Sequence, residues 1–276
     1  MTLRRAFALA GMGIVGVTVL LALFAPWITP HDPFAQNLEA RMVPPFWLDG
    51  SSPQHLFGTD QLGRDYLSRL IYGARISMII GVLVTVCSGV IGTSLGVAGG
   101  FFGGRVDAVV MFIITCRLAI PLILVALTVV SLVGSSFTVV VLTLGLLLWE
   151  RFAVVARITT MQVCRLDYIA AARATGCSRM HILLREVLPN IAQHLIVVAT
   201  LEVALAILLE AALSFLGLGV PSPLPSWGLM ISEAKDYMYF SPWLIMIPGA
   251  ALFVLVLGIN LLGDGLQDWL GATRDA

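Results

Sequence analysis

Five stretches of this sequence each run for more than twenty residues without Asp, Glu, Lys or Arg, and they constrain the fold more than any other feature. A helix that crosses a bilayer needs about 20 consecutive apolar residues. The charge-free stretches are long enough to supply such helices, and they cover residues 6–31, 76–104, 118–149, 211–232 and 237–263. They predict an all-α, polytopic membrane protein.

The composition excludes the main alternatives. Only 12% of the residues are charged, against roughly 25% in an average soluble domain. A disordered chain needs low hydrophobicity and high net charge, whereas here 59% of residues are hydrophobic and 16 Lys and Arg balance 16 Asp and Glu. A nucleic-acid binder carries a basic surplus. We therefore expect membrane lipid around this chain and no nucleic-acid partner.

Turn signals divide the apolar sequence into six expected transmembrane helices. The stretch 118–149 is too long for one span, and Gly134-Ser135-Ser136 inside it is typical of a turn. Three prolines within 215–240 indicate a loop before the last span. The expected spans are 7–29, 76–98, 108–130, 137–157, 192–214 and 241–262.

Basic residues set the expected orientation, because Lys and Arg accumulate on the cytoplasmic side of a membrane protein. The segment 151–185 carries six arginines, so we expect it inside, which places both termini inside (N-in/C-in). The expected inner basic residues are Arg4, Arg5, Arg105, Arg151, Arg157, Arg165, Arg173, Arg179, Arg185 and Arg274. The expected outer ones are Arg41, Arg64, Arg69, Arg75 and Lys235.

Three regions follow from this topology. Residues 1–29 are expected to form a retained anchor span, because the apolar run exceeds the roughly 7–15 residues of a signal-peptide core. Residues 30–75 are expected to form a periplasmic loop that ends in an amphipathic helix on the membrane surface. Its polar face would expose Asp65, Ser68 and Arg69. The core would cover 76–276.

Two short matches to enzyme motifs do not indicate catalysis. Gly11–Gly16 fits G-x-G-x-x-G, and Gly92–Gly96 fits G-x-S-x-G. Both lie inside expected membrane helices, where small residues let a neighbouring helix approach closely. The only lysine, Lys235, follows Ala234 and cannot belong to a Walker A loop. We expect no catalytic residues and no metal or cofactor in this chain; if ATP is used, ATP and Mg²⁺ bind another chain.

The segment between the fourth and fifth expected spans has the most informative pattern. Gly176 separates two short helical patterns. In the second, Met180, Leu183, Leu184 and Val187 recur at helical spacing and predict one apolar face. Ser178 fits an N-cap and Pro189 is expected to end the helix. Two interpretations stay open: an ordinary amphipathic loop on the membrane surface, or a docking surface for another protein.

This segment resembles the EAA loop of bacterial ABC importer permeases, whose pattern is E-A-A-x3-G-x9-I-x-L-P. Here Ala170 replaces the glutamate and Glu186 the isoleucine. In that family the loop forms cytosolic coupling helices that sit in a cleft of the ATPase subunit. The resemblance implies a coupling loop at 165–189. Its expected contact residues are Ala171, Ala172, Gly176, Met180, Leu183, Leu184, Leu188 and Pro189.

Three further segments, 58–77, 210–228 and 260–268, resemble the C-type permease subunit of the dipeptide/oligopeptide/nickel importer family. The resemblance implies a bacterial inner-membrane permease that moves peptides or a related small solute. It implies four kinds of partner: a second homologous permease subunit, two ABC ATPase subunits that bind ATP and Mg²⁺, a periplasmic or lipid-anchored substrate-binding protein, and lipid. The chain itself would carry out no bond chemistry.

Three ionisable residues fall deep inside the expected spans, where each costs about 2.5–3.5 kcal/mol. Arg117, Glu202 and Glu210 are therefore expected to line the translocation pathway. Arg117 and Glu202 lie at similar expected depths, which favours an ion pair between them, although each could meet a different partner. A proton-coupled secondary transporter, with Glu202 or Glu210 as proton carrier, is the alternative function, and a membrane enzyme ranks third.

Overall fold

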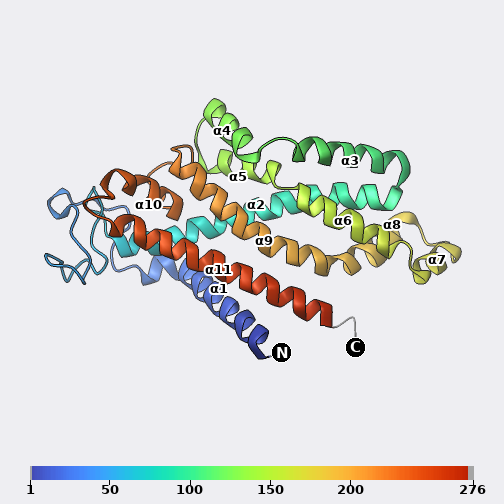
Figure 1. Ribbon diagram of the computed structural model, residues 1–276, viewed down its shortest axis with the longest axis horizontal. Coiled ribbons are helices and arrows are strands. Elements are labelled where there is room, and N and C mark those ends of the chain that lie inside the picture. Colours follow the sequence, from blue (N-terminus) through green and yellow to red (C-terminus); the bar gives the residue numbers. More distant parts are fainter. Residues whose placement is uncertain (1, 273–276) are drawn as a thin grey trace.

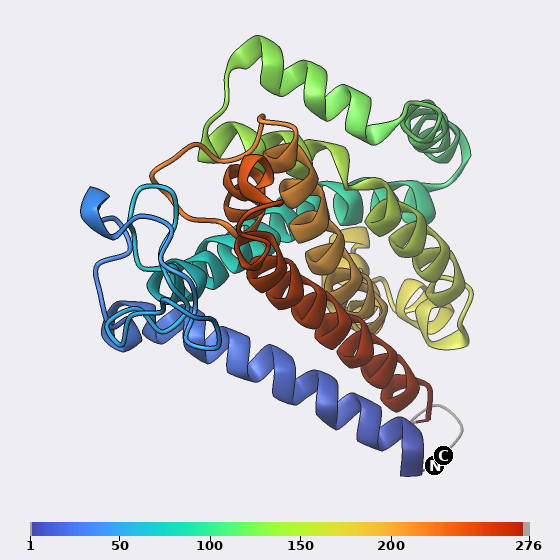
Figure 2. The same cartoon turned by 60° about the vertical axis from the view of Figure 1, so that its left-hand side comes forward.

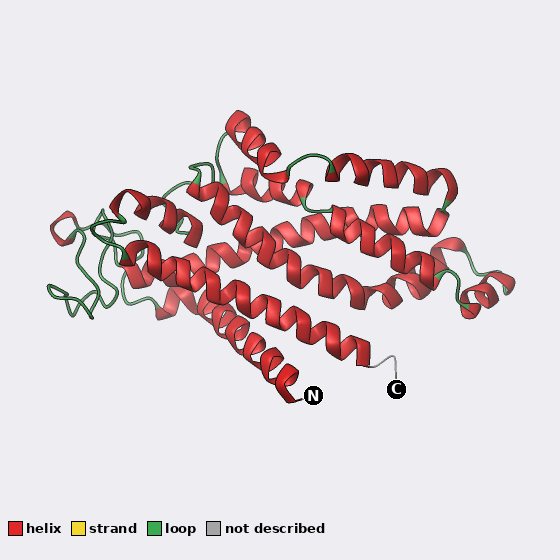
Figure 3. Ribbon diagram, in the orientation of Figure 1, coloured by secondary structure: helices red, strands yellow, loops and turns green. Residues whose placement is uncertain are grey.

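A computed structural model describes residues 2–272, with side chains from Arg5 to Asp268, and within that range every regular element is a helix. This confirms the all-α prediction. Figures 1 and 3 show long helices running along one axis, with extended loops at one end of the molecule and the short helix α7 at the opposite end. Arg274 and the side chain of Arg4, both counted among the inner positive charges, lie outside this description.

Five helical segments in the described range are long and apolar enough to cross a membrane, or six if one bent pair is a single span. The five are α1 (Thr2–Ile28), α2 (Tyr66–Phe102), α5 with α6 (Phe137–Leu147 and Glu150–Val163), α8 through η2 to α9 (Arg179–His181, Ile182–Val187 and Leu188–Phe215), and α11 (Trp243–Ala272). The bent pair is α3 (Gly104–Leu118) with α4 (Leu122–Val133). The short elements are η1 (Leu38–Ala40), α7 (Asp167–Ala174), α10 (Trp227–Ala234) and η3 (Lys235–Tyr237).

The expectation of one straight helix over 108–130 is wrong. Helices α3 and α4 meet at an angle of 80°. The break coincides with Pro121, which lacks a backbone N–H and disfavours helical geometry at Ile120 before it. The expected turn at Gly134-Ser135-Ser136 is confirmed: Gly134 has φ +99°, and the Ser136 side chain accepts a hydrogen bond from the N–H of Val139 at 3.2 Å.

Two expectations for polar loops need correction. There is no separate surface helix within 62–75, because α2 begins at Tyr66 and continues without interruption to Phe102. Its N-cap is Asp65, and Arg69 is 1% exposed instead of facing water. The 215–240 segment is not simply a loop, since it contains α10, which packs against α9 and α11. Buried ion pairs of Arg64 and Arg69 with Glu233 hold α10 and the start of α2 together.

Glycines set the close helix contacts, as the sequence predicts. A Cβ added at Gly92 would lie 2.6 Å from the Cβ of Phe152, and one at Gly96 would lie 2.8 Å from the Cβ of Ala156, so these positions admit no side chain. Helix α2 packs along α6 through this stripe. Gly11 has the same role where α1 crosses α11, which lie side by side in Figures 1 and 2. The two enzyme-like motifs therefore contribute packing surfaces.

The two ends of the molecule differ in structure, and each is given a name. The loop end comprises 29–65 and 216–242, and the α7 end comprises 164–187. They lie at opposite ends of the long axis in Figure 1.

Candidate functional site

A helix C-cap at Gly176 determines the path of the chain at the α7 end. Helix α7 ends at Ala174, and Gly176 follows with φ +83°. The N–H of Cys177 donates to the carbonyl of Ala172 at 3.0 Å, and the N–H of Gly176 donates to the carbonyl of Arg173 at 3.1 Å. This is the bonding pattern of a Schellman cap, which requires a left-handed residue and so favours glycine. Gly176 therefore reverses the chain between two short helices, as expected.

Apolar contacts fix the α7 end to the long helices. Ile169 and Val187 are fully buried and Ile182 is 1% exposed. They pack in one cluster with Ala156 of α6 and Ile191 of α9. The segment is therefore packed onto these helices and is not a free loop.

The expected apolar face divides into a buried and an exposed part. Val187 is buried and Leu183 partly so, but Met180 is 61% exposed and Leu184 is 54% exposed. Of the other expected contact residues, Ala171, Gly176 and Pro189 are exposed, and Ala172 and Leu188 are partly buried. Tyr168 of α7 adds an aromatic ring; partial burial raises the pKa of its hydroxyl, and the Glu186 carboxylate adds to the shift, so the ring is neutral at neutral pH.

Pro189 does not end the helix, so that expectation is wrong. The helical run continues from Arg179 to Phe215. Residues Ile182–Val187 form a π-helical turn directly before α9, and Pro189 lies in the first turn of α9. A proline removes one hydrogen-bond donor and crowds the carbonyl four residues earlier. The wider π-turn lets the helix pass through the proline, so Met180 and the middle of α9 belong to one continuous helical rod.

A second group of charged side chains lies where the helices are interrupted inside the membrane-spanning region. Arg117 lies in the last turn of α3, Glu150 and Arg151 begin α6, and Glu202 lies near the middle of α9. The guanidinium of Arg117 is 3.8 Å from the Glu150 carboxylate, and the Nε of Arg151 is 3.5 Å from the Glu202 carboxylate. We call these four residues the mid-membrane charge strip. Its formal charges sum to zero.

The expected Arg117–Glu202 pair is therefore wrong, since each residue has a different partner. The Nε of Arg117 donates to the carbonyl of Leu147 at 2.9 Å, and its Nη1 donates to the carbonyl of Ile120 at 3.3 Å. Those carbonyls lie at the end of α5 and at the break between α3 and α4, where no helical N–H serves them. Arg117 thus supplies side-chain hydrogen-bond donors to carbonyl groups that are left unpaired at two helix ends.

Glu202 is the most isolated member of the strip. Its side chain is 1% exposed, and neither carboxylate oxygen has a hydrogen-bond partner within the described residues. Its neighbour Arg151 is 56% exposed. A buried carboxylate beside an outward-facing guanidinium leaves a positive group at the protein surface at this depth. Buried ionisable groups of this kind mark solute or ion pathways in membrane proteins.

Glu210 lies two turns further along α9 and has another role in the fold. One of its oxygens accepts hydrogen bonds from the hydroxyls of Ser214 at 2.7 Å and Ser226 at 2.8 Å. Ser226 is the N-cap of α10. Glu210 therefore ties α10 to α9, and its second oxygen has no hydrogen-bond partner in the described structure.

Sequence reasoning missed Glu150 and Arg151, although a signal was available. Arg151 was assigned to the inner side, yet it begins α6 inside the 137–163 span. The two residues directly follow the longest charge-free stretch. Arg157, likewise assigned inside, lies on the same helix, and its Nη2 donates to Asp107 of α3 at 2.6 Å.

A third polar group is the loop-end ion network, which includes Arg69, a residue expected to be exposed and found buried. It comprises Asp60, Arg64, Arg69 and Glu233, and both arginines are 2% exposed or less. The Nε of Arg64 donates to Asp60 at 2.6 Å, and Arg64 and Arg69 each donate to Glu233 of α10, at 3.0 and 2.9 Å. Arg69 also donates to Asp60. Two carboxylates balance two guanidiniums and join α10 to the start of α2.

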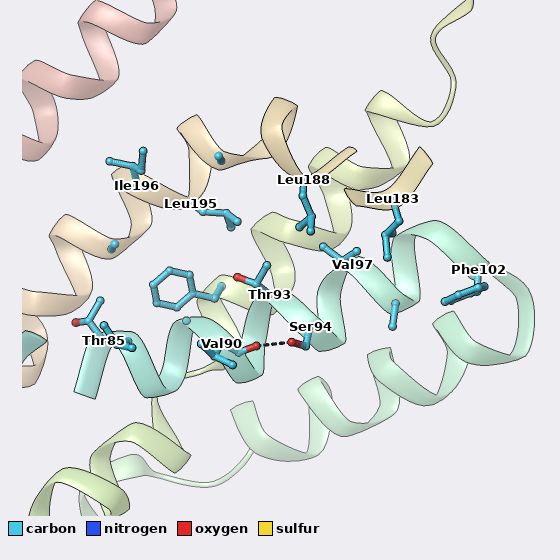
Figure 4. Close-up of a pocket in the computed structure, with 16 residues that line it drawn as sticks. Thr85, Val90, Thr93, Ser94, Val97, Phe102, Leu183, Leu188, Leu195 and Ile196 are labelled. Atoms are coloured by element: carbon cyan, nitrogen blue, oxygen red, sulfur yellow. Dashed lines mark hydrogen bonds between the residues drawn. The ribbon is translucent and has the colours of Figure 1, made fainter. Parts of the chain in front are cut away.

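A pocket between the helices has a different chemistry. It has a volume of about 750 Å³ and lies between α2 and the rod formed by η2 and α9, with Phe152 of α6 on its wall. Figure 4 shows Val90, Val97, Leu188 and Leu195 directed into it. No residue lining it is charged. Such a pocket fits apolar chain or lipid better than the charged ends of a peptide.

Comparison with known proteins gives concordant matches. Residues 88–274 match the family model described as binding-protein-dependent transport system inner membrane component, and residues 3–45 match the N-terminal TM domain of oligopeptide transport permease C. A di/tripeptide transport system permease protein of Pseudomonas aeruginosa is 40% identical over 95% of this chain and 87% of its own length. Dipeptide transport system permease proteins of Haemophilus influenzae and Escherichia coli are 38% and 39% identical over 95% and 97% of this chain, and 89% of each relative.

Proposed function

This chain belongs to the family of inner membrane components of binding-protein-dependent transport systems, and from that premise we propose that it carries di- or oligopeptides across the membrane. It is a multi-pass inner-membrane protein and the permease subunit of an ABC importer, not an enzyme. The peptide substrate is supported by the relatives, which are named as dipeptide and di/tripeptide permeases.

We propose six spans with both termini inside, so that the loop end faces the periplasm and the α7 end faces the cytosol. The bent α3–α4 pair then counts as one span, which fits a charged residue at its break that binds helix carbonyls. Exposed arginines gather at the α7 end, including Arg165, Arg173, Arg179 and Arg185, as the positive-inside rule requires.

Cysteine labelling tests this orientation. In a background with the four native cysteines replaced, Ser51→Cys at the loop end is expected to react with a membrane-impermeant maleimide on intact cells. Thr175→Cys at the α7 end is expected to react only after the membrane is opened. Both positions are exposed, so the reverse pattern would overturn the proposed orientation.

The α7 end is proposed to bind an ATPase subunit, and the exposure of Met180 and Leu184 on a segment anchored by buried residues carries this proposal. Two exposed apolar side chains at the tip of a rigid body suit insertion into a cleft. Ala171, Ala172, Gly176, Leu183, Leu188 and Pro189 would shape or support the same surface. ATP and Mg²⁺ would bind two such ATPase subunits, with a second permease subunit and a substrate-binding protein completing the importer.

The mid-membrane charge strip is proposed to face the pathway. A peptide carries a positive amino end and a negative carboxylate, and Arg151 with Glu202 offers the complementary charges at one depth. Arg117 and Glu210 would hold the helices that form the pathway walls in place. Arg117 does so by binding the end of α5, and Glu210 by binding the N-cap of α10. The helical rod would carry motion of the ATPases from Met180 to Glu202.

Uptake of a labelled dipeptide tests the function as a whole. Cells that lack the chromosomal copy and express this chain with its partner subunits are expected to take up the dipeptide, and uptake is expected to require ATP. Glu202→Gln and Arg117→Met are expected to lower uptake, whereas Glu39→Gln at an exposed loop position should not. Uptake driven by a proton gradient without ATP would favour the secondary transporter. Unchanged uptake by both strip variants would overturn the pathway role.

A further inference from the structure

Three potential metal ligands converge at the loop end, outside the residues assigned to transport. The Nδ1 of His55 is 2.9 Å from the Oδ1 of Asp65, and the Nδ1 of His31 is 3.7 Å from the same oxygen. All three atoms lie within 4.8 Å of one another. They come from three separate segments: the chain just after α1, the loop, and the N-cap of α2.

The backbone holds these side chains in this arrangement. The Oδ2 of Asp65 accepts the N–H of Ser68 at 2.8 Å, so Oδ1 is the oxygen left for the two imidazoles. The N–H of His31 donates to the hydroxyl of the same Ser68 at 3.1 Å. One serine thus fixes both the carboxylate and the histidine that approaches from α1. The imidazole rings of His31 and His55 lie with their centroids 4.9 Å apart.

The charge balance at Asp65 also calls for a cation. Its side chain is 2% exposed, and its ion-pairing partners among the described residues are the two histidines. Asp60, buried to the same extent, has two arginines. Buried carboxylates are paired with a cation or coordinate a metal, because an uncompensated buried charge is expensive. A metal ion bound by the two imidazoles and the carboxylate would supply that charge.

We propose that His31, His55 and Asp65 bind one divalent transition-metal ion of the zinc class. Two imidazole nitrogens and a carboxylate oxygen form a donor set that suits Zn²⁺, which binds them at about 2.0–2.2 Å. Tetrahedral coordination at that bond length separates ligand atoms by roughly 3.3 Å, so rotations of the side chains suffice to close the site. His31 is 41% exposed, which leaves the fourth position open to water.

A bound ion would join the end of α1 to the start of α2. These helices are separated by a long loop, and the site links both ends of that loop directly. Metal bound only by the folded chain stabilises it by mass action. The inference does not rest on the transported solute, because none of the three residues belongs to the mid-membrane charge strip or to the α7 end.

Direct metal binding tests the proposal. The full-length protein in detergent, purified without a polyhistidine tag, is equilibrated with Zn²⁺ against a competing chelator, and bound metal is measured by mass spectrometry. We expect one Zn²⁺ per chain, and visible ligand-field bands when Co²⁺ replaces it. The double variant His31→Ala/His55→Ala should lose at least about 100-fold in affinity, since even outer-shell changes cost about 10–100-fold. His181→Ala, at the exposed α7 end, is the matched control and should bind as the wild type does.

Thermal unfolding separates loss of ligands from loss of fold. Without metal, the double variant is expected to unfold at a somewhat lower temperature than the wild type, because Asp65 loses its contact with His55, but to remain folded, because the Asp65–Ser68 cap stays intact. Zn²⁺ should raise the unfolding temperature of the wild type and of His181→Ala, but not that of the double variant. If the wild type binds no stoichiometric Zn²⁺, or the folded double variant binds it equally well, the site is a histidine–carboxylate hydrogen-bond cluster and the proposal is overturned.

Discussion

The loop end and the α7 end use charged residues in opposite ways. At the loop end, Arg64 and Arg69 are buried and each donates to two carboxylates. At the α7 end the arginines lie on the surface, and the buried contacts are made by Ile169, Ile182 and Val187. The loop end pairs its buried arginines with carboxylates, whereas the α7 end keeps its arginines on the surface and packs through apolar side chains.

The two ends are therefore held in place by different interactions: charge pairs at the loop end and apolar packing at the α7 end. The loop-end network joins residues far apart in the sequence, and removing one charge leaves a buried excess of the opposite charge. The α7 end keeps its position by packing alone, and its tip has no partner within the described part of this chain. We therefore expect substitutions at the loop end to reduce stability, and substitutions at the tip of the α7 end to reduce binding.

The largest effect is expected for Arg69→Met. Breaking a buried ion pair by removing one partner costs about 3–5 kcal/mol, and here both Asp60 and Glu233 lose a donor. The unfolding free energy in detergent should fall by that amount. Arg105→Met, which removes an exposed arginine at the start of α3, should change it little. Equal effects from the two variants would show that the loop-end network adds no special stability.

The double variant Met180→Glu/Leu184→Glu tests the other side of the comparison. Both side chains are more than half exposed, so the unfolding temperature should stay near that of the wild type. Loss of two central apolar contacts should weaken ATPase binding by at least about 2 kcal/mol, or roughly 30-fold, as measured by co-purification or affinity. The matched control is Tyr239→Glu/Phe240→Glu, which changes two side chains that are each 85% exposed at the loop end. Loss of ATPase binding in the control would contradict the assignment.

The N-caps of α10 and α8 provide another comparison of the two ends, with a smaller expected difference in stability. Ser226 caps α10 at the loop end and donates to the buried Glu210, whereas Ser178 caps α8 at the α7 end and is exposed. Losing a cap costs about 1 kcal/mol, and leaving a buried acceptor without its donor adds about 1–3 kcal/mol. Ser226→Ala should therefore destabilise the protein clearly more than Ser178→Ala. Thermal unfolding of the two variants side by side decides this, and the reverse order would show that Glu210 does not depend on Ser226.

The smallest effect on ATPase binding is expected for Gly176→Ala. A left-handed residue with a Cβ costs about 1–2 kcal/mol, and Gly176 has φ +83° with open space around it. The strain should distort the turn between α7 and α8 and lower ATPase affinity with little change in global unfolding. Gly249→Ala in α11, where an added Cβ also meets open space, is the control: it should leave ATPase affinity unchanged and, as a helix-interior substitution, should not lower stability. Wild-type ATPase affinity in Gly176→Ala would show that the turn does not shape the docking surface.

The features that the sequence predicts well are those dictated by local chemistry. Long charge-free stretches predict apolar helices because lipid accepts little else, and Gly134 and Gly176 mark turns because a left-handed backbone favours glycine. The contact of α2 with α6 follows from the spacing of Gly92 and Gly96.

The features that escaped prediction depend on contacts between distant residues. Arg69 and Glu233 are 164 positions apart, so the sequence around Arg69 suggests an exposed helix face and gives no sign of its partner. Glu202 pairs with Arg151 and not with Arg117. The breaks between α3 and α4 and between α5 and α6 place Arg117 beside Glu150, and Arg151 beside Glu202. Similar depth in the membrane does not determine which helices are neighbours.

The unbroken helical rod from Arg179 to Phe215 has a thermodynamic consequence. Met180 and Glu202 lie on that rod, separated by about 33 Å at 1.5 Å per residue, with no hinge loop between them. Two sites that respond to the same displacement are linked reciprocally: the factor by which one ligand changes the affinity of the other must hold in both directions. An ATPase that alters solute affinity at the strip by pressing on the tip must therefore bind more or less tightly, by the same factor, when solute is present. Measuring ATPase affinity at rising solute concentration would report on solute binding at the strip from the far end of the rod.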